Sequence, residues 1–228
     1  MIVIRSKRLR GVLRILLPFV LIPLTVLLGC ILIDAQQHLL VSCLVAVLAL
    51  GLFLAGFERK TTGARRMVIV AVMTALCIVG RFIPFFKPVT ALTIITAMYL
   101  GSESGFLTGA LAALLSNFTF GQGPWTPFQM LAWGMIGLAA GYMAGPLKRH
   151  RWLLLLYGTA SGVLYSLLMD VWTVLWYNGT LNWQLYAGAV AASLPHMALY
   201  GVANFAFLWF LARPFGEKLA RIHRKYGL

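Results

Sequence analysis

The sequence predicts an all-α protein, a polytopic bundle of helices that cross a membrane several times. Hydrophobic residues make up 61% of the 228 residues and charged residues only 11%, and the mean hydropathy is +0.88. A soluble domain of this length could not bury so much apolar surface, so lipid must surround most of it. Short polar stretches separate the apolar runs, which predict eight helical segments at residues 12–33, 38–57, 66–84, 88–101, 105–119, 128–146, 152–177 and 185–212.

The first two segments predict an N-terminal transmembrane hairpin at residues 1–62, ahead of a six-helix core with a basic tail at residues 63–228. A charged and polar linker at residues 57–66 separates the two parts. The basic N-terminus and its apolar run resemble a signal peptide, but Pro18 and Pro23 interrupt the run and no Ala-x-Ala cleavage site follows. We therefore expect a retained anchor. Because the hairpin carries few polar side chains, we expect it to serve packing or assembly.

The middle of the core predicts a cavity. Segments 88–101 and 105–119 hold about 14 and 15 residues, or roughly 21–23 Å of helix, which is short of a ~30 Å hydrocarbon core. Their outer ends lead into two stretches rich in aromatic residues, 81–88 and 117–130. Irregular backbone at membrane depth is tolerated where it is buried in protein or lines a water-filled cavity. The short helices and these stretches together predict a cavity open to the outside of the cell.

The net charge of +14 is distributed unevenly along the chain. If the N-terminus is cytoplasmic, 17 of the 19 Lys and Arg residues fall in cytoplasmic segments, and only Arg81 and Lys87 fall outside. Cytoplasmic loops of membrane proteins carry this excess of positive charge, so both termini are predicted to be cytoplasmic. The charge therefore needs no nucleic-acid partner to explain it.

Small residues recur four positions apart in four of the segments, and such pairs let helix backbones approach closely in lipid. We expect most of them to serve packing within the bundle. They are Gly105/Gly109, Gly137/Gly141/Gly145, Gly158/Gly162 and Ala71/Ala75.

No catalytic site and no metal site are predicted. The three cysteines lie in apolar segments without Cys-x-x-Cys spacing, which is typical of small core residues. Ser104 and Ser161 each precede a glycine, as the nucleophile of intramembrane serine proteases does, and His196 follows later. Neither serine has the glycine that those proteases carry two positions earlier. The sequence also contains no Gly-x-x-x-x-Gly-Lys phosphate loop, so this chain is not expected to hydrolyse ATP in that way.

The uncharged stretch from Asn117 to Met130 is the strongest candidate for a ligand-binding segment. It holds two prolines, two glycines and four aromatic residues between two long apolar runs. Broken or shortened helices of this kind are good sequence pointers to the substrate site of a transporter. We therefore expect this stretch to line the predicted cavity.

Two further side chains are candidates for chemistry within the membrane. Asp170 lies inside segment 152–177, and an acid in a membrane span marks a functional site by default, because burying its charge is costly. The alternative is a structural pairing of Asp170 with Arg81 or His196. His196 shares a helix face with Tyr200 four residues on, where it either contacts a ligand or is satisfied by a neighbour. A proton-coupled secondary carrier that uses Asp170 and His196 is the alternative function.

The run from Phe118 to Met130, followed by Ala132-Trp-Gly-Met-Ile-Gly137, resembles the membrane-embedded substrate-binding (S) components of energy-coupling factor (ECF) transporters. Within that family, Gly121-Gln-Gly-Pro-Trp-Thr-Pro127 is most similar to the cobalamin-type components. The resemblance covers about residues 64–212. Further similar segments are Gly80-Arg-Phe82, Phe86-Lys-Pro-Val-Thr90 and Thr108-Gly-Ala-Leu111.

The resemblance implies a six-helix ECF S-component-like core, preceded here by an extra two-helix N-terminal hairpin. It implies a bacterial cell-membrane protein that imports a vitamin, with cobalamin as the expected ligand and no cofactor of its own. The chain would dock on a transmembrane coupling subunit that carries two cytoplasmic ATPase subunits, which use the ATP. Family members present an Ala-x-x-x-Ala face to the coupling subunit, and that motif falls on Ala71 and Ala75.

A corrin is broad and flat with amide arms, so aromatic faces and amide or hydroxyl partners suit it better than charges. Another vitamin, or another large neutral ligand, could bind to the same aromatic, amide and hydroxyl side chains. Arg81 and Lys87 either close over the ligand or are solvated loop charges, and Trp176 is alternatively an interfacial anchor. The expected substrate-binding residues are Arg81, Lys87, Asn117, Gln122, Trp125, Thr126, Phe128, Gln129, Trp133, Asp170, Trp172, Trp176, Asn178 and His196.

Overall fold

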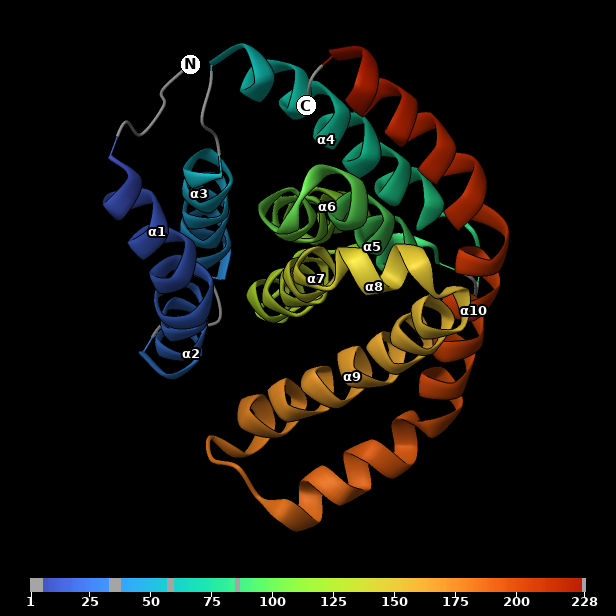
Figure 1. Ribbon diagram of the computed structural model, residues 1–228. Coiled ribbons are helices and arrows are strands. Elements are labelled where there is room, and N and C mark those ends of the chain that lie inside the picture. The colour runs from blue at the N-terminus through green and yellow to red at the C-terminus, as the bar shows by residue number, and fades with distance from the viewer. Residues whose placement is uncertain (1–5, 33–37, 57–59, 85–86, 227–228) are drawn as a thin grey trace.

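The computed structural model describes residues 6–32, 38–56, 60–84 and 87–226 of the chain. All the regular structure in these described ranges is helical, which confirms the all-α class (Figure 1). The elements are α1 (Lys7–Leu16), η1 (Leu17–Leu21), α2 (Ile22–Leu32), α3 (His38–Ala55), α4 (Lys60–Gly80), α5 (Val89–Leu100), α6 (Ser102–Phe120), α7 (Thr126–Tyr142), α8 (Ala144–Arg149), α9 (Arg151–Asn178) and α10 (Trp183–Tyr226).

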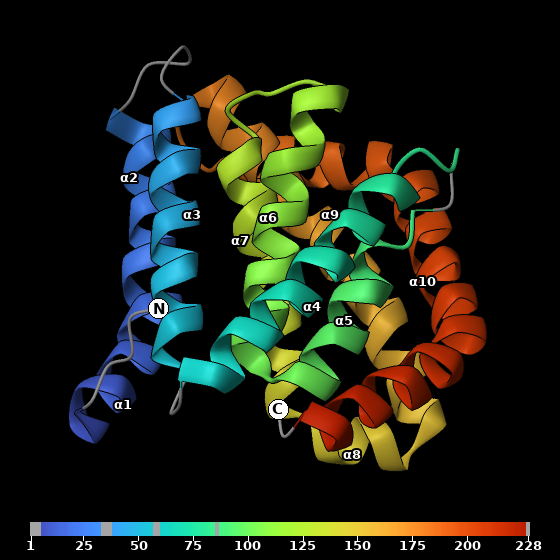
Figure 2. The ribbon, with the colours of Figure 1, turned by 90° about the horizontal axis from the view of Figure 1, so that it is seen from above.

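The N-terminal helices lie together beside the rest of the bundle. α1, η1 and α2 form one apolar span from Lys7 to Gly29, and α3 packs along α2 (Figure 2). The span widens into the π-helical turn η1 at Pro18, because proline has no N–H group to complete the α-helical pattern. The predicted linker covers residues 57–66. Residues 57–59 lie outside the described residues, and residues 60–66 belong to helix α4 rather than to a linker.

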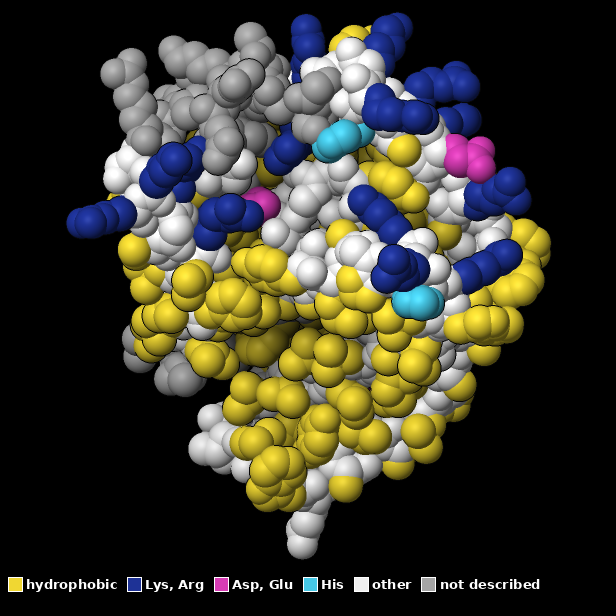
Figure 3. All heavy atoms as spheres, viewed as in Figure 1, with side chains coloured by type: hydrophobic (Ala, Val, Ile, Leu, Met, Phe, Trp, Pro, Cys, Tyr) yellow, Lys and Arg dark blue, Asp and Glu magenta, His cyan; other side chains and the backbone are white. Residues whose placement is uncertain are grey.

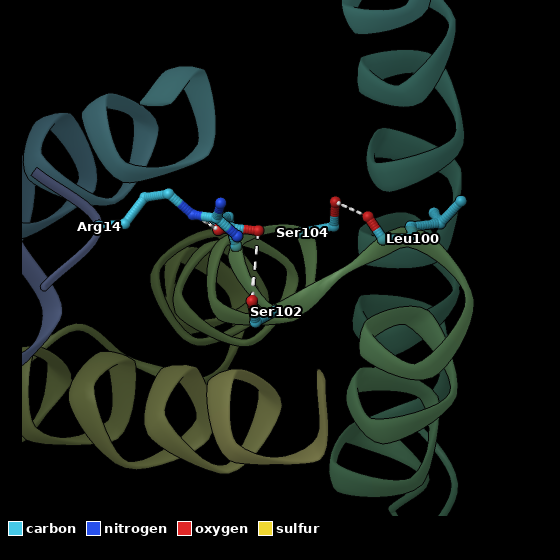
Figure 4. A network of polar contacts seen from close by, with 5 residues as sticks. Arg14, Leu100, Ser102 and Ser104 are labelled. Atoms are coloured by element: carbon cyan, nitrogen blue, oxygen red, sulfur yellow. Dashed lines mark hydrogen bonds and ion pairs between the residues drawn. The ribbon is translucent and has the colours of Figure 1, made fainter. Parts of the chain in front are cut away.

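A partly buried ion pair joins the N-terminal helices to the core. The Nε of Arg14 on α1 donates to the carboxylate of Glu103, which is buried in the first turn of α6. Ser102 Oγ donates to the same carboxylate at 3.3 Å, and Ser104 Oγ donates to the Leu100 carbonyl oxygen at 2.8 Å (Figure 4). An acid in the first turn also faces the positive end of the helix dipole. The charge of Glu103 therefore holds α1 against the start of α6.

The predicted segments that correspond to α6 and α7 have different boundaries in the structure. α6 begins directly after Gly101, because a φ of 98° at this glycine lets the chain reverse within one residue. The predicted gap between segments 88–101 and 105–119 is therefore almost entirely helix. Segment 128–146 splits at Met143 into α7 and the short helix α8.

The predicted end of the last segment at residue 212 is wrong, because α10 continues through the basic tail to Tyr226. Pro214 lies inside the helix, and the residues after it still have an apolar side on which Gly216 and Leu219 are buried. At the far end, Arg65 Nη1 of α4 donates to the Tyr226 carbonyl oxygen at 3.0 Å. Packing on the core thus keeps the tail helical after a residue that usually ends a helix.

Three helical stretches of the described chain are long and apolar enough to cross a membrane: Lys7–Gly29, Arg151–Asn178 and Trp183–Tyr226. α5 has only 12 residues, and nearly all its side chains are buried at the centre of the bundle. A helix surrounded by other helices needs no polar face. The visible face in Figure 3 shows Lys and Arg side chains gathered at one end and hydrophobic side chains over the rest. We call the end with α8 and the last turns of α10 the basic end.

α6 and α7 pack backbone to backbone through small residues, as their four-residue spacing predicts. A Cβ atom added at Gly109 would lie 2.5 Å from the Trp133 carbonyl oxygen, and one added at Gly137 would lie 2.5 Å from the Gly105 carbonyl oxygen. No larger residue fits at such contacts without a backbone shift. Gly145 behaves differently, because nothing lies within 4 Å of a Cβ placed there. Its predicted packing role is wrong, since it belongs to α8 and lies beyond the contact.

Replacing Gly109 by Ala tests this packing. Gly→Ala in an unobstructed helix stabilises by about 1 kcal/mol, but here the methyl group meets the α7 backbone, and overpacking costs about 1–3 kcal/mol. We expect Gly109→Ala to lower the thermal unfolding midpoint of the purified protein in detergent, measured by circular dichroism. Gly145→Ala is the matched control and should leave the midpoint unchanged or raise it. Equal midpoints for the two variants would contradict the close contact.

Candidate ligand-binding site beside Arg81

Arg81 is the centre of the polar structure at the end of the bundle opposite the basic end. It follows α4, and only 8% of its surface is exposed. Its Nη1 donates to Asn117 Oδ1 at 2.8 Å and to Ser116 Oγ. Its guanidinium carbon lies 4.8 Å from the Phe120 ring centroid and 5.4 Å from that of Trp133. Neutral oxygens and aromatic faces, rather than a carboxylate, therefore stabilise this buried cation.

The uncharged stretch after Asn117 is more helical than predicted, because α6 runs to Phe120 and α7 begins at Thr126. Its polar side chains bond one another. Asn117 Nδ2 donates to Thr126 Oγ1 at 2.9 Å and to Gln129 Oε1 at 2.8 Å. Gln122 accepts from Thr126 Oγ1 at 3.0 Å and donates to a backbone carbonyl of α6. The predicted long loop lining a cavity is thus a short, internally bonded connection.

A layer of aromatic hydroxyl groups lies beneath this connection. Trp133 stacks on Tyr165 with centroids 4.9 Å apart, and its Nε1 donates to Tyr200 OH at 3.2 Å. Gln129 Nε2 donates to Tyr165 OH at 3.0 Å, and Thr90 Oγ1 donates to Tyr200 OH at 3.3 Å. Both tyrosines are buried. The layer connects α5, α7, α9 and α10 behind Arg81.

A cavity of about 400 Å³ opens beside Arg81. Lys87 and His196 also line it, and its apolar walls come from the α4–α5 connection, Phe120 and Leu199. Lys87 Nζ lies 6.0 Å from the Phe120 ring centroid, and His196 is exposed and stacks on a tyrosine of the layer below. The described residues that line the cavity include two cations and a histidine but no acid.

The cavity keeps its positive charges close together. Burial, and after it the charge of Arg81, lower the pKa of Lys87. The Nε atom of Arg81 is buried and has no hydrogen-bond partner among the described residues. An anionic group placed in the cavity would relieve the repulsion between the two cations and gain charge-assisted hydrogen bonds.

Asp170 lies apart from this cavity. It is buried on α9, and its Oδ2 accepts a hydrogen bond from Ser193 Oγ of α10 at 2.7 Å. Within the described part of the chain it forms no ion pair with Arg81 or His196. The alternative of a structural pairing with Arg81 or His196 is therefore not what the structure shows, since the hydrogen-bond partner of Asp170 is Ser193.

The remaining predicted site residues stay outside the cavity. Trp125 packs edge-on against Trp172 with centroids 5.9 Å apart, and Trp172 stacks on Trp176. Phe128 is buried in the core. Asn178 is exposed, and its amide nitrogen donates to the Thr180 carbonyl oxygen at 3.0 Å within its own turn. In this conformation, Arg81, Lys87 and His196 are the only predicted side chains among the residues that line the cavity.

Several residues of the site were not predicted, among them Ser116, Phe120 and Tyr165. Ser116 precedes a predicted ligand residue, and Phe120 lies within the uncharged stretch. Their closeness in sequence to predicted site residues was the only indication that they belong to the site. Tyr165 has a weaker signal, because only its position one turn from Ser161 places it on the inner face of α9.

The predicted coupling residues Ala71 and Ala75 lie on the outer face of α4. Both are exposed, together with Val68, Val72 and Val79, while Met73 and Cys77 on the other face are buried. Two alanines on an exposed apolar stripe leave a shallow surface that a partner helix could approach closely. The surface that the prediction requires is therefore accessible.

The fold and the site are those of a helical membrane protein with a cationic cavity beside Arg81. The family model described as "ECF transporter, substrate-specific component" matches residues 65–222, and the chain belongs to this family. It is therefore a multi-pass membrane protein and a substrate-binding transporter subunit. Family membership also implies association with ECF coupling and ATPase subunits. Comparisons with curated proteins and with solved structures found no match.

Replacing Asn117 by Ala tests the bonded connection. The change removes one hydrogen bond each from Thr126, Gln129 and Arg81 in a buried site, and a buried group that loses its partner costs about 1–3 kcal/mol. We expect a lower free energy of unfolding, measured in mixed detergent micelles. Asn178→Ala removes an exposed amide and should change the stability by less than about 0.5 kcal/mol. If both variants were equally stable, the network around Asn117 would not hold the helices together.

Proposed function

We propose that this chain captures a vitamin from outside a bacterial cell and delivers it to an ECF transporter. The observation that supports this most directly is the cationic cavity of about 400 Å³ at the end opposite the basic end. Because cytoplasmic segments of membrane proteins are rich in Lys and Arg, the basic end and both termini would lie in the cytoplasm. The cavity would then face outward. Two cytoplasmic ATPase subunits would supply the energy through the coupling subunit.

The chemistry of the cavity favours a ligand with a carboxylate or phosphate group. The fork of N–H donors in arginine matches such groups, and a lysine adds a second positive charge. Phe120 and Leu199 would pack against the apolar part of the ligand. The volume lies at the lower end of the ~300–1,000 Å³ range of small-molecule sites. A small acidic vitamin therefore fits the cavity best.

Cobalamin is the second candidate, supported by the run Gly121-Gln-Gly-Pro-Trp-Thr-Pro127 and its similarity to cobalamin-type components. A corrinoid is larger than the cavity, so it would enter only if the α4–α5 and α6–α7 connections moved apart. Its visible absorption offers a direct check. Protein purified from cobalamin-supplemented medium would be pink if this candidate is right, and colourless without corrinoid binding if it is wrong.

The division into a hairpin at residues 1–62 and a core at residues 63–228 belongs to the same proposal. The family match starts at residue 65, after the hairpin. The hairpin packs on α6 and α7 and is held by Arg14 and Glu103. It would act as a structural addition to the core rather than as part of the ligand site.

Pairs of acidic and neutral probes test the ligand chemistry by calorimetry: nicotinate with nicotinamide, biotin with biotinamide, and pantothenate with panthenol. We expect one acid to bind and its neutral partner to bind much more weakly. Arg81→Gln should weaken that acid about 10–150-fold, because a hydrogen bond to a charged group contributes about 1.5–3 kcal/mol. Lys87→Gln should act in the same direction, and Lys225→Gln in the tail is the control. Tighter binding of a neutral partner would contradict the assignment.

Bulky residues on α4 test the coupling face. Ala71→Trp and Ala75→Trp would keep a partner helix at a distance, so vitamin uptake into cells should be lost while binding by the purified chain persists. Leu156→Trp, at an exposed position of α9, should leave both intact. Uptake that survives the α4 changes would place the coupling face elsewhere. Uptake that fails without ATPase subunits but persists with an uncoupler would exclude the proton-coupled carrier.

A further inference from the structure

A second cavity, of about 330 Å³, lies at the basic end between α5, α8, α9 and α10. It is lined by Lys148, Arg151 and Arg213, by the aromatic residues Tyr99 and Trp209, and by an apolar floor. Arg81 lies at the opposite end of the bundle, and no residue lines both cavities. The site is therefore separate from the candidate vitamin site.

Two of its cations have no carboxylate partner. Lys148 Nζ lies 4.5 Å from the Tyr99 ring centroid, and the Arg151 guanidinium lies 3.8 Å from the Trp209 ring centroid. Arg151 also donates to the Trp209 carbonyl oxygen at 3.0 Å. Contacts with ring faces hold both cations in place without neutralising them. Among the described residues, neither forms an ion pair.

The acid in the lining does not balance these charges. Glu217 accepts from Arg213 Nε at 3.0 Å, which leaves Lys148 and Arg151 as a net positive pair. Arg151 is also the first residue of the 28-residue helix α9, whose N-terminus has no side-chain cap. The free N–H groups and the helix dipole there favour the same sign of ligand charge. The mouth of the cavity therefore suits an anion.

The rest of the cavity suits a hydrocarbon chain. Its floor contains the buried residues Leu147, Leu154 and Leu208. Beside it, Trp152 and Phe210 are 70% and 71% exposed on the sides of α9 and α10 that the lipid would cover. A soluble anion would use only the cations, whereas an amphipathic ligand uses both the cations and this apolar surface. Basic pockets between helices at the cytoplasmic surface bind the head groups of anionic lipids.

We propose that this cavity binds one anionic phospholipid, with its phosphate between Lys148 and Arg151 and an acyl chain along Leu154 and Leu208. The lipid would lie where α8, α9 and the last part of α10 meet, and would stabilise their packing. This site does not depend on the identity of the vitamin or on the direction of its transport.

Native mass spectrometry of the full-length chain in detergent tests the proposal, with phosphatidylglycerol and phosphatidylcholine as probes. We expect the wild type to retain phosphatidylglycerol about tenfold better than phosphatidylcholine. Lys148→Gln and Arg151→Gln should each reduce that retention several-fold, whereas Arg151→Lys should keep most of it. Arg149→Gln is the matched control, because Arg149 is the neighbouring cation but does not line the cavity. Circular dichroism confirms that each variant is folded.

Three outcomes would overturn the proposal. Equal retention of the two lipids by the wild type would show that the charge is not recognised. Equal losses for Lys148→Gln and Arg149→Gln would assign retention to the general surface charge. Displacement of the lipid by glycerol 3-phosphate or inorganic phosphate at similar concentrations would make this a site for soluble anions.

Discussion

The contact between the α6 and α7 backbones is the constraint on which the candidate site depends. Gly109 and Gly137 let the two helices meet without side chains between them. A connection of five residues, 121–125, then suffices to join their ends. This brings Asn117 at the end of α6 within hydrogen-bonding distance of Thr126 and Gln129 at the start of α7. A wider separation would leave these amides and hydroxyls to face lipid unpaired, which a membrane interior penalises strongly.

Arg81 is bound by the ends of α6 and α7 that this contact brings together. The paired ends of α6 and α7 present Ser116, Asn117 and the Phe120 ring to its guanidinium group. These groups stabilise the charge but do not neutralise it, so the cavity beside it remains positive. A salt bridge with Asp170 would have had the opposite effect, because a neutral pair has little attraction for an anionic ligand. Asp170 instead accepts a hydrogen bond from Ser193, and among the described residues it forms no ion pair with Arg81.

At both ends of the bundle, a cation beside an aromatic ring lines a cavity. Lys87 and Lys148 each lie near an aromatic ring and line a cavity, and neither forms an ion pair within the described residues. The two cavities differ in their surroundings. The first is lined by the α4–α5 connection at the end opposite the basic end, and the second lies between α5, α8, α9 and α10 at the basic end. Their positions are the basis for proposing a ligand from outside the cell for the first and a lipid for the second.

The helical class, the short buried α5 and the close packing of Gly105 and Gly109 were all predictable, because each follows from composition or from a local spacing. The extent of α10 was not, since Pro214 normally ends a helix and only packing on the core allows it to continue. The loop character of residues 117–130 was overestimated for a similar reason. Their polar side chains suggested exposure to a ligand, but their partners lie across the α6–α7 contact and cannot be identified from spacing.

The sequence by itself determined that the chain lies in a membrane, which end carries the positive charge, and which family it belongs to. Those properties follow from the hydropathy, the charges and the motifs of segments that are continuous in the chain. Only the tertiary structure decided that Arg81, Lys87 and His196 share a cavity while Asp170 and Trp176 do not. The reason is that His196 is distant in sequence from Arg81 and Lys87, and only the packing of the helices fixes the distance between them.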